Sequence, residues 1–220
     1  MFLRSQDAPA VMPWNLVAKY DPDQPRAEDG KWTDGGGGER SAQDIIAIAK
    51  AIKKIKNTVG EYQAYGGTTE ILSSADAPAV RAELEALEEA ARTHEPSFPA
   101  DYSEERFAFT DGAIGGAQTG LRVYLGRDED AGGLITGAMS VNTTEGVWTI
   151  VSAGATGILP GAGTAMFADI VRDAADAGVG LYLLSTGAGI KFYRSVGMTQ
   201  GDFQEFEASA QRVRDIAEGI

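Results

Sequence analysis

The sequence predicts an α/β fold built on a mixed, mostly antiparallel sheet that is flanked by helices. Three segments with the character of strands follow one another between turns, at 120–127, 134–141 and 147–155, which is typical of an antiparallel meander. A fully apolar segment, LYLLST (181–186), follows a glycine-rich loop and a helix that we expect to end near Ala177. A strand that is apolar throughout suits a central position in a sheet that is covered on both faces.

The other expected elements complete an alternation of strands and helices. In chain order they are a strand over 68–73, a helix over 76–92 with Pro78 in its first turn, a short helix within 187–198, a short strand over 203–208 and an amphipathic C-terminal helix.

The chain divides into three predicted parts: 1–40, 41–60 and 61–220. The first part is interrupted by four prolines and by the run Gly35–Gly38, so we expect an extended or disordered arm. It carries three large aromatic residues, Trp14, Tyr20 and Trp32, which leaves two interpretations open: a flexible tail, or an arm that docks on a partner.

The second part is predicted to be a basic amphipathic helix over 41–57, with Ser41 as its N-cap. One apolar stripe recurs at helical spacing (Ile45, Ile48, Ile52, Ile55), and four lysines lie on the other faces (Lys50, Lys53, Lys54, Lys56). Two interpretations stay open. The helix packs on its own domain or on a sister subunit, or it docks on an acidic surface, nucleic acid or membrane.

Composition excludes several classes of function. The 220 residues carry a formal net charge of −13, which disfavours general binding of nucleic acid or anionic membranes. Ten acids and three bases lie between Asp76 and Asp111, so part of this charge is concentrated there. The chain has no cysteine and one histidine, His94, so we expect no thiol chemistry and no metal site. No membrane-spanning segment or secretion signal is recognisable, which favours a cytoplasmic location.

The loop between Ile158 and Thr164 is the strongest candidate site. Gly161 and Gly163 stand at the mouth of the predicted helix, where backbone N–H groups converge and the helix dipole favours an anion. No Gly-Lys-Ser/Thr follows, and the preceding strand belongs to a meander, so the loop is neither a Walker loop nor a Rossmann fingerprint. A tight turn that allows close helix packing is the alternative role of these glycines.

Four segments, in this order and spacing, resemble the GCN5-related N-acetyltransferase (GNAT) superfamily over about 68–198. They are EILSSADAPAVRAELEA for the first strand and helix, GGLITGAMSV for the third strand, TIVSAGATGILPGAGTAM for the fourth strand, loop and third helix, and STGAGIKFYRSVGM for the end of the fifth strand and the fourth helix.

The resemblance implies acetyl transfer from acetyl-CoA to an amine by direct attack, without a metal. The pantetheine arm would add to the fourth strand around Val151 and Ala153, and the residues of the pyrophosphate loop would be Gly161, Ala162, Gly163 and Thr164. Tyr193 matches the tyrosine that protonates the leaving thiolate, although a core tyrosine with a solvated hydroxyl is the alternative. Glu145, at the start of the fourth strand, is the nearest candidate base, and water is its substitute. Where the family's loop begins with Gln or Arg, this chain has Ile158, and Pro160 lacks an amide proton.

A second interpretation comes from the arm. The segment YDPDQPRAEDGKWTDGGGG resembles short segments of head-morphogenesis and other virion proteins of tailed bacteriophages. This resemblance implies a structural protein in a virion, associated with a capsid, portal or connector, in which residues 1–57 bind a phage protein or another copy of the chain.

Overall fold

The computed structural model describes residues 42–93, 104–144, 146–186, 189–202 and 204–220, all within the compact unit Gly37–Ile220. The helices of these residues are α1 (Ala42–Ala64), α2 (Ala77–Thr93), α3 (Glu104–Gly115), the 3-10 turn η1 (Gly116–Thr119), α4 (Ala162–Ala177), α5 (Ile190–Ser195) and α6 (Ala210–Gly219). The strands are β1 (Gly67–Leu72), β2 (Arg122–Asp128), β3 (Leu134–Asn142), β4 (Val147–Ala155), β5 (Gly180–Leu184), β6 (Thr199–Gln200) and β7 (Glu205–Ala208).

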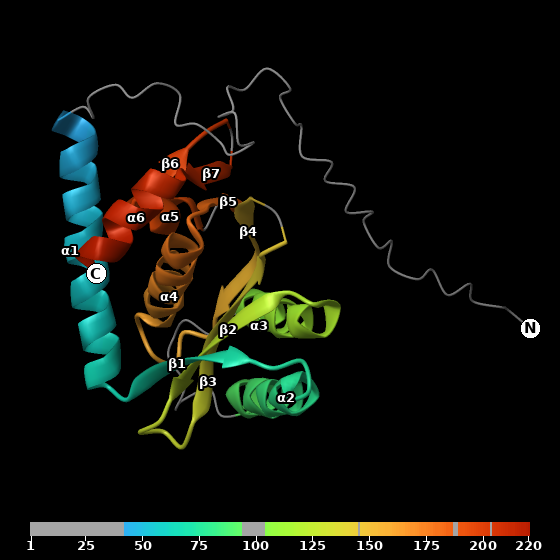
Figure 1. Cartoon of the computed structure of the whole chain (residues 1–220). Helices are drawn as coiled ribbons and strands as arrows, with labels where there is room; N and C mark the ends of the chain where they lie inside the picture. Colours follow the sequence, from blue (N-terminus) through green and yellow to red (C-terminus); the bar gives the residue numbers. More distant parts are fainter. Residues whose placement is uncertain (1–41, 94–103, 145, 187–188, 203) are drawn as a thin grey trace, which may run out of the picture. The chain divides into compact units, whose positions relative to one another are not determined.

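The strands form one sheet in the order β1-β2-β3-β4-β5-β7-β6. Every neighbouring pair is antiparallel except β4 and β5, which run parallel because α4 carries the chain from the end of one back to the start of the other. The predicted fold class, a mixed and mostly antiparallel sheet flanked by helices, is therefore confirmed (Figure 1).

Alternating side chains divide the core between the two faces of the sheet. In β2, Tyr124 belongs to the cluster under α4, whereas Val123 and Leu125 belong to the cluster under α2 and α3. The first cluster is the larger, and it also buries Trp148. Helices α2 and α3 cover one face and α4 covers the other, with α1 and α6 packed outside α4 (Figure 1).

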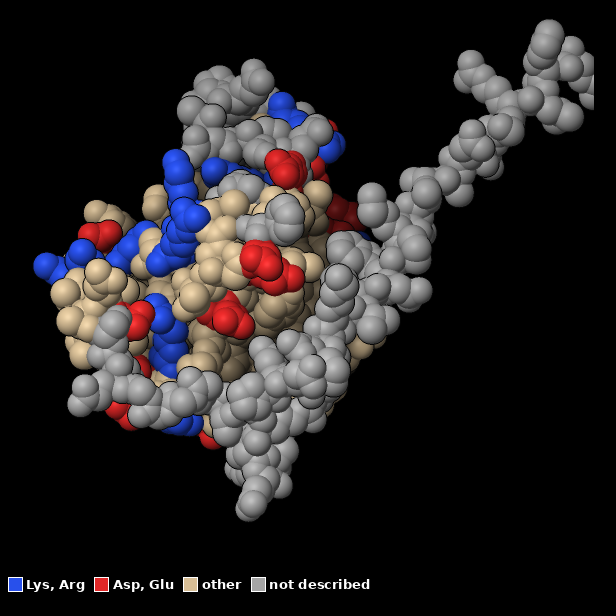
Figure 2. Space-filling view, turned by 90° about the horizontal axis from the view of Figure 1, so that it is seen from above, with Lys and Arg blue, Asp and Glu red and all other residues tan. Residues whose placement is uncertain are grey.

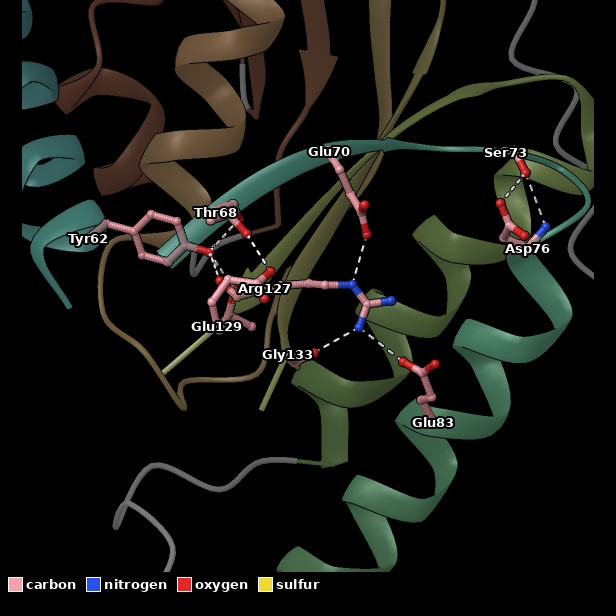
Figure 3. A network of polar contacts seen from close by, with 10 residues as sticks. Tyr62, Thr68, Glu70, Ser73, Asp76, Glu83, Arg127, Glu129 and Gly133 are labelled. Atoms are coloured by element: carbon pink, nitrogen blue, oxygen red, sulfur yellow. Dashed lines mark hydrogen bonds and ion pairs between the residues drawn. The ribbon is translucent and has the colours of Figure 1, made fainter. Parts of the chain in front are cut away.

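Helix α1 is anchored to the sheet at its C-terminal end by Tyr62. The ring is buried, and its hydroxyl lies 2.9 Å from the carbonyl oxygens of Thr68 and Arg127 and 2.8 Å from Oγ1 of Thr136 (Figure 3). Burial raises the pKa of the Tyr62 phenol, so the hydroxyl stays protonated and available to these acceptors.

The predicted stripe of isoleucines on this helix is only partly right. Ile48 and Ile55 are buried and Ile52 is half-buried, but Ile45 is 55% exposed. Ile45 lies beyond the part of α1 that the body of the domain covers. The helix also continues through Gly60 to Ala64, beyond the predicted end at 57, and a β-carbon at Gly60 would meet nothing within 4 Å.

Helix α3 was not predicted. Its buried positions include Phe107, Thr110 and Ala113, while Phe109 is partly exposed on the other side, so its apolar residues do not mark one face. Strand β7 corresponds to the short strand expected over 203–208, and a two-residue strand that was not predicted, β6, pairs with it.

Several predictions concern residues outside the described ranges. They are the arm 1–40, the Ser41 N-cap and the candidate base Glu145. Within the described ranges, no helix combines the length and apolar character that crossing a membrane requires.

Candidate functional site

The parallel strands β4 and β5 separate halfway along β4. Their pairing runs from Val147 and Gly180 to Ile150 and Leu183 and then stops. Strand β4 continues to Ala155, whereas β5 ends at Leu184. On the side of β5, the second half of β4 therefore has no strand partner among the described residues, and its backbone groups on that edge are open to an extended ligand.

A β-bulge marks the point of separation. Val141 and Ser140 of β3 oppose Ile150 and Ser152 of β4, so Val151 is the extra residue between them. Its side chain is 56% exposed, and Leu184 at the end of β5 is 46% exposed. Two apolar side chains thus border the strand separation, which suits the aliphatic part of a ligand.

The N-terminus of α4 follows directly after β4. Gly161 is its N-cap in a left-handed conformation (φ 99°), and no described side chain accepts a hydrogen bond from the first turn. Ala165 makes the first helical bond, donating to the Gly161 carbonyl over 3.0 Å. The amides of Ala162, Gly163 and Thr164 are therefore first-turn donors of an uncapped helix, the arrangement that favours an anion.

Gly161 is also required by packing. A β-carbon there would lie 3.1 Å from Cβ of Tyr62 and 3.2 Å from Cγ2 of Thr58, so α1 supports the loop from behind. At Gly163, by contrast, a β-carbon would meet only Cε of Met139 at an ordinary 3.7 Å. The close-packing interpretation therefore holds for Gly161, while space remains at Gly163.

The surroundings of Ile158 and Leu159 explain their apolar character. Ile158 packs against the cluster under α2 and α3, and Leu159 packs against the cluster under α4. The two side chains therefore fasten the loop to both halves of the core. Pro160 is exposed, and it leaves the amides of the following helical turn unchanged.

Tyr193 lies in α5 and is 6% exposed. Its ring centroid is 4.9 Å from that of Phe192, 5.6 Å from that of Phe206 and 6.4 Å from that of Phe167. Burial raises the pKa of Tyr193 to about 12, so the phenol keeps its proton at neutral pH. This protonation state is the one that a general acid requires, although the aromatic surroundings also fit the core interpretation.

One core cluster connects the predicted residues. Ala162 and Tyr193 belong to it and Ala153 packs against it, so strand, helix start and tyrosine share one side of the sheet. Among the described residues, the aromatic rings that contact Tyr193 are those of phenylalanines. These contacts do not involve Val151 or the loop.

Three residues near the loop were missed from the sequence. Thr58 and Tyr62 support Gly161, and Arg106 of α3 lies so close to Gly157 that a β-carbon there would be 2.7 Å from Nη1. The aromatic residue at 62 continues the helical spacing from Ile48 and Ile55, which was a usable signal. The sequence offered no comparable signal for Arg106, because helix α3 was not predicted.

Two shallow hollows lie elsewhere. One, of about 220 Å³, lies between α2 and α3 and is lined by Glu85, Glu88 and Asp111 among others. The other, of about 310 Å³, lies between β1 and α2 beside Arg127. Across the part of the chain that the structure describes, no group of three or more His, Cys, Asp or Glu side chains could hold a metal ion.

Neither family models nor curated proteins match this chain. Among solved structures it is similar to AtaTR bound with acetyl-CoA, at 16% identity and a TM-score of 0.48, over 67% of this chain and 96% of that one. It is also similar to the PaiA N-acetyltransferase from Thermoplasma acidophilum in complex with coenzyme A, at 15% identity and a TM-score of 0.42, over 64% of this chain and 96% of that one.

Proposed function

We propose that this protein transfers an acetyl group from acetyl-CoA to an amine. The observation that carries the proposal is the separation of β4 from β5, which leaves a free strand edge leading directly to the uncapped start of α4. An extended pantetheine arm matches a free strand edge, and a pyrophosphate matches converging amides at a helix N-terminus.

The loop offers donors of the right kind for this cosubstrate. The amides of Ala162, Gly163 and Thr164 would face the pyrophosphate, and Val151 and Ala153 would pair with the pantetheine amides. Arg106 places a guanidinium against Gly157 and adds positive charge near the loop, although Ile158 contributes none.

The proposed reaction needs no covalent enzyme intermediate. The amine nitrogen attacks the thioester carbonyl carbon, the carbon–sulfur bond breaks, and the Tyr193 hydroxyl gives its proton to the departing thiolate. The nitrogen loses its proton to water or to Glu145. Backbone N–H groups at the strand separation would polarise the carbonyl oxygen in the transition state.

Calorimetry with acetyl-CoA on the full chain tests the binding half of the proposal. We expect micromolar or tighter affinity, about −8 kcal/mol. Gly163→Asp places a carboxylate among the amides and should weaken binding at least tenfold, whereas Gly163→Ala, its matched control, should bind like the parent because the site has room. Absence of binding by the parent protein would overturn the proposal.

A transfer assay with small amines and lysine peptides tests the chemical half. Tyr193→Phe should lower the rate by about 100-fold and leave affinity for acetyl-CoA unchanged. Transfer at the parental rate with every amine would assign Tyr193 to the core alone.

The alternative function, a structural protein of a phage virion, depends on a sequence in the arm that lies outside the described residues. A cytoplasmic location accompanies the enzyme proposal, and a virion location accompanies the alternative.

A further inference from the structure

The positive charges of this protein fall into two groups that differ in their partners. Arginines of the sheet, α2 and α4 are each ion-paired with a carboxylate (Arg81, Arg92, Arg122, Arg127, Arg172). By contrast, the cations of α1, α5 and α6 form no ion pair with a described residue, and we call them the unpaired basic face (Lys50, Lys53, Lys54, Lys56, Lys191, Arg194, Arg212, Arg214).

Helix α1 packs against both α5 and α6, so the eight cations lie on neighbouring helices. Lys54 of α1 donates to Ser195 of α5 over 2.6 Å, and Arg212 of α6 donates to the Gly197 carbonyl just after α5. The same three helices carry four carboxylates (Asp44, Glu61, Asp215, Glu218). Figure 2 shows a band of Lys and Arg side chains on the side where Figure 1 places α1. This local excess of positive charge contrasts with the net charge of −13 for the whole chain.

The outward side of α1 combines charge with apolar surface. Lys50, Lys53 and Lys56 are exposed and follow one another at helical spacing. At the N-terminal end of this side, Ile46 is 53% exposed, and Ile45, which lies three residues before the buried Ile48 and borders the inward side, is 55% exposed. The fold does not use these side chains, since Ile48, Ile55 and Tyr62 on the opposite side hold α1 to the body.

We propose that the unpaired basic face, centred on the outward side of α1, docks an acidic segment of a partner protein that also carries apolar residues. Glutamates or aspartates of that segment would pair with the lysines, and its apolar side chains would cover Ile45 and Ile46. The proposal is independent of acetyl transfer, because neither the strand separation nor the loop takes part in it.

Charge and shape separate this partner from other polyanions. A long nucleic acid would extend beyond the basic face and meet the repulsion of an acidic protein, whereas a short peptide meets only the local field. A membrane helix needs a broad apolar side, and the outward side of α1 offers two adjacent isoleucines at one end.

A second copy of this chain is a poorer partner. Antiparallel pairing of two α1 helices about their middle would place lysines against lysines. Two carboxylates of the acidic helices of another copy are also already engaged, since Glu83 binds Arg127 and Asp111 binds Arg81.

Fluorescence anisotropy on the full chain tests the proposal with three labelled probes. The first is a twelve-residue peptide of glutamates and leucines, about 12 residues being three helical turns. The second replaces its leucines with serines, and the third is a single-stranded oligonucleotide of equal charge. We expect the first probe to bind most tightly, with an affinity that falls as salt rises from about 0.05 to 0.5 M.

Two triple variants remove the same charge from different places. Lys50→Gln/Lys53→Gln/Lys56→Gln should weaken binding of the first peptide by about tenfold. The control, Arg81→Gln/Arg92→Gln/Arg172→Gln, lowers the net charge equally but removes paired cations, so it should leave binding within about twofold. Ile45→Ser/Ile46→Ser should weaken binding of the leucine peptide and not of the serine peptide.

Three results would overturn the proposal. They are tighter binding of the oligonucleotide than of either peptide, equal losses in the two triple variants, and no binding of the first peptide at the lowest salt. Vesicles that contain anionic lipid test the membrane alternative. Binding of the protein to these vesicles in preference to the leucine peptide would also contradict the proposal.

Discussion

The two sides of the sheet hold their helices by different means. Where α2 meets β1 and β2, arginines bind carboxylates across elements, and Arg127 contacts Glu70 at 2.8 Å, Glu83 at 3.0 Å and the Gly133 carbonyl at 2.8 Å (Figure 3). Where α1 and α4 meet the sheet, buried tyrosines add polar contacts of another kind: Tyr62 as described, and Tyr124, whose hydroxyl donates to Asp173 over 2.7 Å. The same carboxylate also forms an ion pair with Arg122 of β2 at 3.2 Å.

This difference indicates which charges serve the fold. Burial alone would lower the pKa of Arg127, but its hydrogen bonds to Glu70 and Glu83 outweigh that effect and raise the pKa, so the cation is held by its partners. The lysines of α1 have no carboxylate partner among the described residues, so we expect them to contribute little to stability. Four changes of decreasing expected size test this comparison.

The largest effect is expected from Tyr62→Phe. The variant removes a buried hydroxyl that contacts two carbonyls and Oγ1 of Thr136, and it should lower the free energy of unfolding by about 3 kcal/mol. Urea unfolding measures it. Tyr65→Phe is the control, because that ring is 68% exposed and the change should be neutral. A loss below about 0.5 kcal/mol would show that apolar packing alone holds α1.

The second effect is a loss of stability in alkali through Tyr193. Its pKa is raised from 10.0 to about 12 by burial, so its contribution is complete below about pH 10 and is lost as the pH rises through 12. The contribution is at most about 2–3 kcal/mol. Thermal unfolding of the parent and of Tyr193→Phe measures this contribution. The measurements run from about pH 8 to about pH 12, which is about two units on either side of the ordinary pKa of tyrosine. The parent should lose more stability than the variant, and parallel curves would contradict burial of the phenol.

The third change, Arg127→Gln, tests the ion-paired side. It removes contacts with two carboxylates from a side chain that is 18% exposed, and should cost about 1–2 kcal/mol, with a smaller cost at high salt. Arg92→Gln, at a more exposed pair within one helix, should cost about 0.5 kcal/mol or less. Equal costs would mean that the cross-element network adds nothing beyond a surface pair.

The smallest effect belongs to the unpaired basic face. Lys50→Gln/Lys53→Gln/Lys56→Gln should change the free energy of unfolding by less than about 0.5 kcal/mol, because no described carboxylate loses a partner. Urea unfolding beside Arg127→Gln gives the comparison directly. If the free energy of unfolding fell as much as in Arg127→Gln, these lysines would stabilise the fold. The reason to assign them to a partner would then be removed.

Much of the fold was predictable because its signals are local. The meander, the helix after the glycine loop and the apolar strand β5 each follow a period or a turn that neighbouring residues set. The end of α4 at Gly178, in a left-handed conformation, is a signal of the same kind. Helix α3 was missed because its buried side includes a threonine and an alanine, so burial there depends on β3 and β4 rather than on its own pattern.

The candidate site was predictable only in part. The glycines at 161 and 163 marked the loop, but their different roles did not show in the spacing: one is held by Thr58 and Tyr62 from a helix about 100 residues earlier, and the other has room. The role of Ile158 was also not predictable from its position in the loop, because its side chain packs against the cluster under α2 and α3.

By itself the sequence determined most of the order of strands and helices, with α3 and β6 as exceptions, together with the acidic net charge, the basic helix and the glycine loop. Composition, period and turn residues are properties of neighbours in the chain, so they can be read without the fold. Only the tertiary structure decided that β4 and β5 separate after Ile150, that α1 supports the loop through Tyr62, and that, among the described residues, five arginines are ion-paired while eight cations of α1, α5 and α6 are not. Those facts depend on which distant residues meet, and a one-dimensional pattern does not carry that information.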